Sequence, residues 1–185
     1  AVFNFENRSG KKEGDFFCFG ISEGIRSVLT RLAKLDVKSR HASSNNSAAD
    51  LELDYFIEGS LSAMGKNSHI NVSLVNAKSG TNIWTGQYEF LNEEIAIYQD
   101  SIINNILIEL NISSDINESF SNKSGYKNVA TVQLLGQGIY HFDQKNFNEA
   151  LSSFNSVLAL EPDNMVAEFH KANTYFELKN FKEAM

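Results

Sequence analysis

The sequence is poor in residues that form covalent or reactive sites. Cys18 is the single cysteine among 185 residues, so no disulfide can form within the chain. It stands between Phe17 and Phe19, a setting typical of a small core side chain rather than of a low-pKa nucleophile. The absence of disulfides leaves the cellular compartment open, because many exported proteins also lack them.

Basic charge and long apolar runs are scarce as well. Lys and Arg number 16 against 23 Asp and Glu, which gives a formal charge of −7. Because phosphate backbones are bound by clustered basic residues, and those of this chain are scattered, we expect no nucleic acid partner. No segment resembles a signal peptide or approaches the roughly 20 apolar residues of a membrane helix. We expect any membrane anchor of the parent protein to lie outside this sequence.

A repeat of 34 residues is present at the C-terminal end. Lys145–Leu151 recurs as Lys179–Met185, and the same spacing pairs Gly138 with Ala172. This is the period of the tetratricopeptide repeat (TPR), a helix–turn–helix unit. The resemblance to that family is carried by Leu134, Gly138, Phe142, Phe147, Ala150, Leu151, Phe154, Leu158, Leu160 and Pro162, and in the second unit by Ala172, Tyr175, Phe176, Phe181 and Ala184.

The register of the repeat predicts helices near Val129–Phe142, Phe147–Leu160 and Met165–Leu178. Gly138 and Ala150 are small residues placed where the first two helices cross closely. The chain ends inside the second unit, so we expect an excised fragment of a longer protein. We expect the incomplete unit to pack against another molecule, by self-association for example, to pack back on the N-terminal part, or to fray at its end.

TPR arrays bind partners on the concave face that the first helix of each unit presents. The expected partner is therefore a protein or peptide. An alternative for the same residues is packing against a neighbouring element, since fewer than two units are present. The predicted partner-binding residues are Val132, Leu135, Ile139, Asp143, Val166, Phe169, Asn173 and Glu177.

The N-terminal part shows strand and helix patterns in alternation. Helical spacing of apolar residues begins at Ile21, with Ser22 as the expected cap, and again after Asn92, extending to Leu110. Period-two patterns predict strands within Ala1–Phe5, Leu35–Lys38, Tyr55–Ala63, Ile70–Leu74 and Ile83–Tyr88.

These patterns predict three consecutive parts. Residues 1–112 form an α/β domain with a mixed sheet of about five strands and two or three helices. Residues 113–127, rich in serine, form a linker. Residues 128–185 form an all-α TPR helix–turn–helix extension, with one complete repeat and a truncated second one.

About the first 110 residues resemble the TolB amino-terminal-like domain. The segments that carry this resemblance are Val2–Gly10, Phe16–Gly24, Tyr55–Leu61 and Leu74–Tyr88. In that family the domain commonly precedes TPR repeats, as in membrane-anchored CadC-like regulators and cyclase-linked proteins. The resemblance implies an upstream winged-helix DNA-binding domain or nucleotide cyclase, then a membrane span, with this module beyond it. It thereby implies a periplasmic or extracytoplasmic location and a role in signalling or transcriptional regulation.

No motif of a catalytic or metal site accompanies these parts. The chain has four histidines: His41, His69, His141 and His170. They lack metal-ligand spacing, and neither a nucleotide-binding glycine loop nor a nucleophile elbow occurs. We predict a non-catalytic interaction or sensory module without cofactor or metal. The alternative is a small-ligand sensor whose pocket lies in the N-terminal domain, near Arg8, Ser9 and Glu58.

The missing motifs predict that the chain turns over no substrate. Assays of nucleotide turnover, phosphatase activity and esterase activity should remain at background, since no residue constellation supplies a nucleophile with its base. A turnover that is abolished by substituting Cys18, His41 or His69 alone would contradict this prediction.

Overall fold

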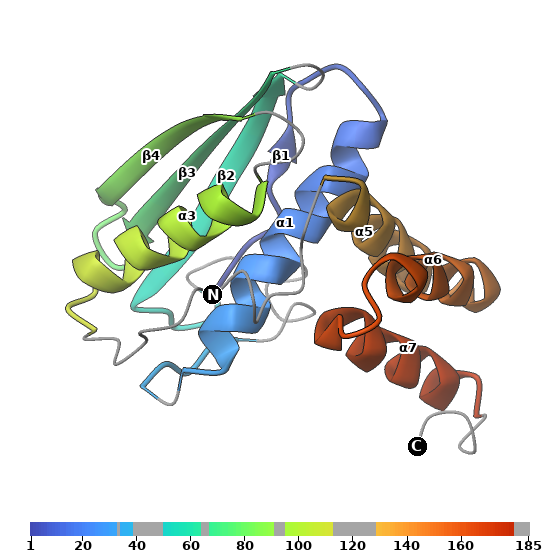
Figure 1. The fold of residues 1–185 in the computed structure, drawn as a ribbon. Coiled ribbons are helices and arrows are strands. Elements are labelled where there is room, and N and C mark those ends of the chain that lie inside the picture. Colours follow the sequence, from blue (N-terminus) through green and yellow to red (C-terminus); the bar gives the residue numbers. More distant parts are fainter. Residues whose placement is uncertain (33, 39–49, 64–66, 91–94, 113–128, 180–185) are drawn as a thin grey trace.

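The structure is a computed structural model of the chain, and it describes residues 1–32, 34–38, 50–63, 67–90, 95–112 and 129–179. The described residues form a mixed four-stranded sheet, two helices against one of its faces, and three further helices beyond them (Figure 1). The predicted fold class, an α/β part followed by an all-helical part, is confirmed.

The sheet has the strand order β1-β2-β3-β4. Its strands are β1 (Glu6–Asn7), β2 (Tyr55–Ala63), β3 (Ser68–Asn76) and β4 (Asn82–Phe90). β1 runs parallel to β2, whereas β2, β3 and β4 form an antiparallel meander. The three meander strands lie where the alternating patterns predict them.

Two strand predictions are wrong. Within Ala1–Phe5, Val2 makes only an isolated parallel bridge to Ile57, and the regular strand β1 lies in the polar stretch that follows. Leu35–Lys38 has no strand structure. Its apolar residues, Leu35 and Val37, instead pack against the rim of the core. Partial burial of every second side chain produces the same alternation as a strand, so the pattern alone did not separate the two.

The first helix, α1 (Glu13–Thr30), begins well before the predicted start at Ile21. Ser22 therefore lies inside the helix and does not cap it. Its hydroxyl donates to the carbonyl oxygen of Cys18 (2.7 Å) and accepts from the backbone N–H of Phe5 (2.9 Å). Ser22 thus ties the N-terminal segment to the helix.

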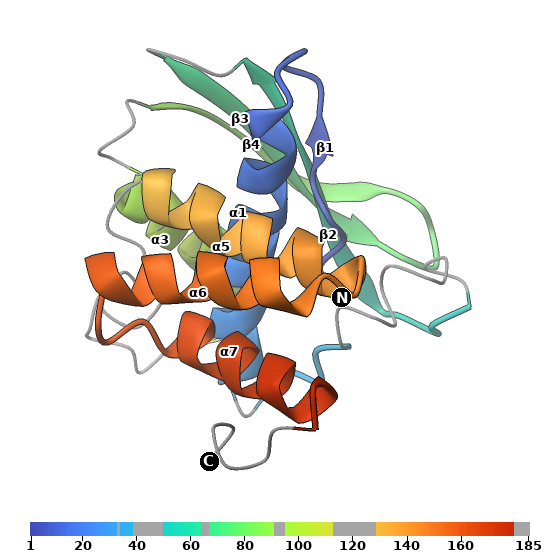
Figure 2. The ribbon, with the colours of Figure 1, turned by 90° about the vertical axis from the view of Figure 1, so that its right-hand side faces the viewer.

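α1 lies between the sheet and the C-terminal helices (Figures 1 and 2). Phe17 stacks on Phe90 at the end of β4, with ring centroids 5.9 Å apart. On the opposite side α1 crosses α5 (Val129–Asp143) with the two backbones in contact. A Cβ atom on Gly136 would lie 1.7 Å from the carbonyl oxygen of Phe16, and one on Gly20 would lie 2.0 Å from that of Val132.

α3 (Ile95–Glu109) packs against β4 and α1. Ile102, Ile103 and Ile106 are fully buried, and the side-chain amide of Asn105 donates to the Tyr88 hydroxyl (3.1 Å). The predicted cap at Asn92 lies outside the described residues, and so does the predicted linker.

The repeat helices α5, α6 (Phe147–Leu160) and α7 (Met165–Glu177) lie close to their predicted bounds. Figure 2 shows them stacked in chain order. Ala150 is fully buried, and a Cβ atom on Gly138 would lie 2.4 Å from the Phe154 ring, so both small residues lie at the predicted crossing. One hydrophobic core extends from the sheet through α1 into these helices.

Replacing Gly136 with alanine is expected to destabilise the fold by at least about 1 kcal/mol. The new methyl group would meet a backbone carbonyl, which cannot move aside as a side chain can, so the over-packing cost is expected at the upper end of its range, about 2–3 kcal/mol. Alanine gains only about 1 kcal/mol in helix propensity. Urea unfolding measures the effect. Ser152→Ala, at an exposed position of α6, is the control and should change stability by less than about 0.5 kcal/mol. Equal stability of Gly136→Ala and the natural chain would contradict the close crossing.

Candidate functional site

The predicted partner-binding residues of α5 lie mostly inside the molecule. Val132, Leu135 and Ile139 have no exposed surface and belong to the layer in which α5 packs on α1. Asp143, at the end of the helix, is exposed. α1 therefore occupies the concave face of the first unit. Val132, Leu135 and Ile139 serve the core and are not accessible to a partner.

The four predicted residues of α7 have different surroundings. Val166 is buried, Asn173 is half-buried and Glu177 is exposed. Phe169 has 61 % of its surface exposed, and so has Phe176, which shares its helix face. An exposed aromatic pair of this kind is unusual on a helix that also packs on a core.

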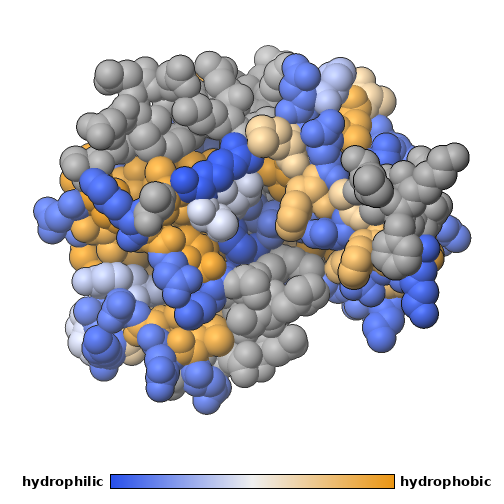
Figure 3. Space-filling view, turned by 90° about the horizontal axis from the view of Figure 1, so that it is seen from below, coloured by the Kyte–Doolittle hydropathy of each residue, from blue (hydrophilic) through white to orange (hydrophobic). Residues whose placement is uncertain are grey.

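These α7 residues form one wall of a groove of about 600 Å³. α1 forms the opposite wall with residues that include Ser27, Thr30 and Arg31, and Val37 and Lys38 also line the groove. On the underside of the molecule, apolar side chains gather on two sides of a band of hydrophilic residues (Figure 3). The groove thus combines the partner face of the second unit with a wall that the α/β part supplies.

A buried polar network joins the two walls. Glu23 and Arg26 of α1 form an ion pair with side chains only 10 % and 5 % exposed, and Arg26 also donates to the carbonyl oxygen of Val2. The other carboxylate oxygen of Glu23, Oε1, lies 3.2 Å from Nε2 of His170 on α7. The His170 ring stacks on Phe154, with centroids 5.6 Å apart. The network connects the N-terminal segment, α1 and α7.

Packing of α7 against the N-terminal part is one of the outcomes expected for the incomplete second unit. Phe181 and Ala184 of that unit lie outside the described residues.

Glu23 and Arg26 are not among the predicted site residues. The signal that could have found them is an acidic and a basic residue one turn apart inside a helix of apolar and small residues, because buried charges are rarely left without a partner.

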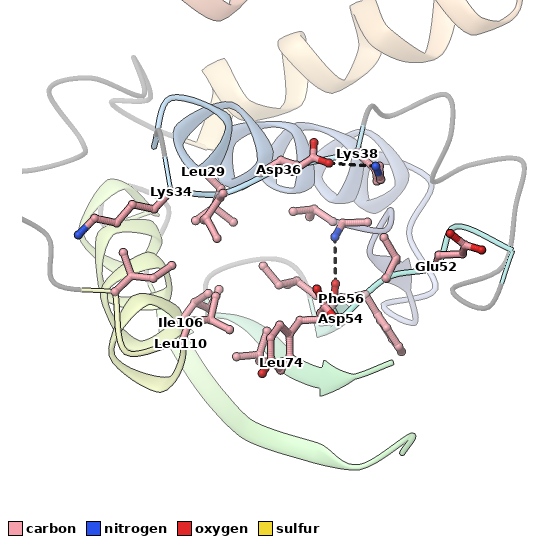
Figure 4. Close-up of a pocket in the computed structure, with 18 residues that line it drawn as sticks. Leu29, Lys34, Asp36, Lys38, Glu52, Asp54, Phe56, Leu74, Ile106 and Leu110 are labelled. Atoms are coloured by element: carbon pink, nitrogen blue, oxygen red, sulfur yellow. Dashed lines mark hydrogen bonds and ion pairs between the residues drawn. The ribbon is translucent and has the colours of Figure 1, made fainter. Parts of the chain in front are cut away.

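A second hollow, of about 420 Å³, lies between α1, α3 and the sheet (Figure 4). We call it the cleft. Its lining is mixed. Leu29 of α1, Leu74 of β3, Ile106 of α3 and Leu110 just after α3 are aliphatic. The charged residues that also line it are Lys34, Asp36, Lys38, Glu52 and Asp54. A closed, dry apolar void of this size would cost on the order of 10 kcal/mol, comparable with the whole stability of a domain. In solution the cleft is therefore filled by water or by a ligand.

Neither hollow includes the residues near which a ligand pocket was predicted, namely Arg8, Ser9 and Glu58. Arg8 forms an exposed ion pair with Glu6, in which Nε lies 2.8 Å from Oε2. The hydrogen bond from Arg8 lowers the pKa of the Glu6 carboxyl. A ligand site near Arg8, Ser9 and Glu58 therefore stays a prediction, and the cleft is a second candidate position in the same part of the chain.

Cys18 and His69, which were considered for catalysis, lie in environments that do not form a catalytic site. Burial raises the pKa of the Cys18 thiol to about 12, so the thiol is protonated at neutral pH and is no nucleophile. His69 lies 3.6 Å from Glu89, whereas His41 is outside the described residues. Across the described ranges, no three His, Cys, Asp or Glu side chains are grouped as metal ligands. No helix there is long and apolar enough to cross a membrane.

Comparison with known proteins agrees with the repeat assignment. The family model of the tetratricopeptide repeat matches residues 141–185. The curated protein "Putative adenylate cyclase 3" of Rhizobium meliloti (strain 1021) is 26 % identical over 194 aligned residues, which include 98 % of this chain. The chain spans only 33 % of that relative. The matched range contains α6 and α7 and only the last residues of α5. The similarity to the cyclase involves a minor part of that relative.

The likeness to solved structures is partial. TolB from Acinetobacter baumannii aligns with 59 % of this chain and 27 % of its own, at 13 % identity and a TM-score of 0.45. Lipoprotein GNA1162 from Neisseria meningitidis aligns with 57 % of this chain and 93 % of its own, at 15 % identity and a TM-score of 0.40. At these scores the likenesses say nothing about function.

Replacing Glu23 with glutamine should destabilise the protein by about 3 kcal/mol, because it leaves the buried guanidinium of Arg26 without its carboxylate. Hydrogen exchange should also speed up in α7, whose contact with α1 includes this network. Glu13→Gln, at an exposed position of the same helix, is the matched control and should stay within about 0.5 kcal/mol of the natural chain. If both variants unfold alike in urea, the network does not hold α7.

Proposed function

We propose that this chain is a non-catalytic protein-interaction module and that its partner binds as a peptide segment in the groove between α1 and α7. The observation that carries the proposal is the pair Phe169 and Phe176. Both rings are largely exposed, and both line the groove. The repeat register predicts a partner contact for Phe169, whereas Phe176 is one of the residues that carry the TPR resemblance.

The composition of the groove suits a peptide with apolar anchors. Aromatic and arginine side chains dominate the binding energy of protein interfaces, and the groove offers Phe169, Phe176 and Arg31. Asn173 lies between the two aromatic residues on α7, where its amide can donate to and accept from a peptide backbone. The floor is rigid, since Glu23 and His170 join its two walls. Rigid walls lower the entropic cost of binding.

The wider role of the module is also a proposal. We infer that it is the extracytoplasmic, sensory part of a larger regulatory or signalling protein whose membrane anchor lies outside this sequence. The TolB-like resemblance of the N-terminal part supports this, and so does the match to part of a protein named as a putative adenylate cyclase. A reporter fusion that is active only in the cytoplasm would contradict the proposed location.

Selection of random displayed peptides on the immobilised protein tests the groove. Enriched peptides should carry apolar or aromatic anchors, and Phe169→Ser combined with Phe176→Ser should weaken their binding by at least about tenfold. The matched control is Ile97→Ser with Ile108→Ser on α3, where both residues are similarly exposed, at 66 % and 68 %. Equal loss in both double variants, or none in the first, would contradict the proposal.

Self-association is separated from partner binding by sedimentation of the free chain. A dimer that dissociates in the Phe169→Ser, Phe176→Ser variant but persists in the α3 control would mean that a second copy occupies the groove. A monomer in all three proteins leaves the groove to a different partner.

A further inference from the structure

Among the residues that the structure describes, the cleft between α1, α3 and the sheet shares only two lining residues with the groove. We propose that it binds a small amphipathic molecule that carries no net charge, with an aliphatic body inside the cleft and a polar end at its rim. This would make the α/β part a ligand-binding domain, in addition to its role in forming the groove wall.

The interior of the cleft selects the aliphatic body. Leu29, Leu74 and Ile106 are buried beneath the hollow, which is large enough for a small ligand (Figure 4). The half-buried side chains of Leu35 and Val37 supply apolar surface that is open to it. Leu110 is half-buried at the α3 side. These side chains neither donate nor accept hydrogen bonds. A water molecule beside them therefore makes fewer hydrogen bonds than in bulk solvent, whereas an aliphatic chain has none to lose.

The rim selects against a net charge. Lys38 pairs with Asp36 (3.0 Å), and Asp54 pairs with Lys78 (2.9 Å), so these rim charges are already compensated. The amino group of Ala1 also lines the cleft, where it donates to the carbonyl oxygen of Tyr55 (3.0 Å) and burial lowers its pKa to about 6. The two other charged side chains at the rim, Lys34 and Glu52, are of opposite sign. They lie at opposite ends of the opening, and their charged groups point away from the aliphatic interior (Figure 4). A charged head group would have to break an existing pair, whereas a hydroxyl or amide can bind beside it.

The cleft and the groove share Val37 and Lys38, which line both hollows. The segment that contains them has no regular secondary structure. A ligand that displaces it in the cleft therefore alters one wall of the groove. This shared wall gives the ligand a physical route to the partner site, although ligand binding itself does not depend on the proposed peptide function.

A series of straight-chain alcohols tests the proposal on the natural chain. Titration of hexanol, octanol and decanol should tighten by about fourfold for each added methylene group, until the chain outgrows the cleft. Methyl NMR signals of Leu29, Leu74, Ile106 and Leu110 should shift first. Octanoate and octylamine should bind at least about tenfold more weakly than octanol. Shifts confined to α7, no saturable binding, or equal binding of the charged analogues would overturn the proposal.

A blocking variant provides the second test. Leu110→Trp places a larger side chain in the cleft from a half-buried position, and it should weaken octanol binding by at least about tenfold. Ile108→Trp is the control, since Ile108 lies on the exposed face of α3. Loss of binding in both variants, or in neither, would overturn the cleft as the site. Should Leu110→Trp fail to fold, the methyl shifts of the natural chain decide alone.

Discussion

The crossing of α1 and α5 is the contact on which the rest of the structure depends. Gly20 and Gly136 let the two helix backbones touch, and neither position has room for a Cβ atom. α1 is consequently enclosed by the sheet and α3 on one side and by the repeat on the other. The hydrophobic core is continuous across this helix, from Val2 in the N-terminal segment to Val166 in α7. The α/β part and the repeat therefore share a core instead of meeting at an exposed interface.

The same crossing changes what the repeat can bind. An isolated TPR unit would present Val132, Leu135 and Ile139 on its concave face, but α1 covers them here. Helix α1 thus covers the α5 part of the concave face, and the accessible part of that face lies on α7. The new groove has one wall from each part of the molecule. Glu23 of α1 contacts His170 of α7 and so joins these walls. Its charge is buried and paired with that of Arg26, as charges removed from water must be.

Much of the fold could be predicted from the sequence because its helices and strands follow from the regular spacing of apolar and small residues. The 34-residue period placed α5, α6 and α7, and it put Gly138 and Ala150 at their crossing. The three meander strands followed from alternation. α1 was harder to delimit, because Gly14, Gly20 and Gly24 weaken its helical pattern. What decides its length is contact with α5, which is distant in sequence.

The site was less predictable than the fold for the same reason. A repeat register says which residues face inward, but it does not say what stands opposite them. For Val132, Leu135 and Ile139 the opposite element is α1, and for Phe169 it is a groove. No local pattern distinguishes these cases, since Leu135 and Phe169 are both apolar and stand 34 residues apart, at the same position of the repeat. The distinction arises only when the crossing at Gly136 is known.

The shared segment at Val37 and Lys38 gives the two hollows a definite physical relation. Both residues line both hollows. A change in the segment's conformation when a ligand binds the cleft therefore changes the free energy of peptide binding in the groove. Any such difference is reciprocal: a cleft ligand that tightens peptide binding must itself bind more tightly when the peptide is present. The buried network of Glu23, Arg26 and His170 fixes the remaining walls, so the segment is the part of the groove left to respond. Under the proposed function, the segment that contains Val37 and Lys38 is the route by which a ligand in the cleft can act on the groove.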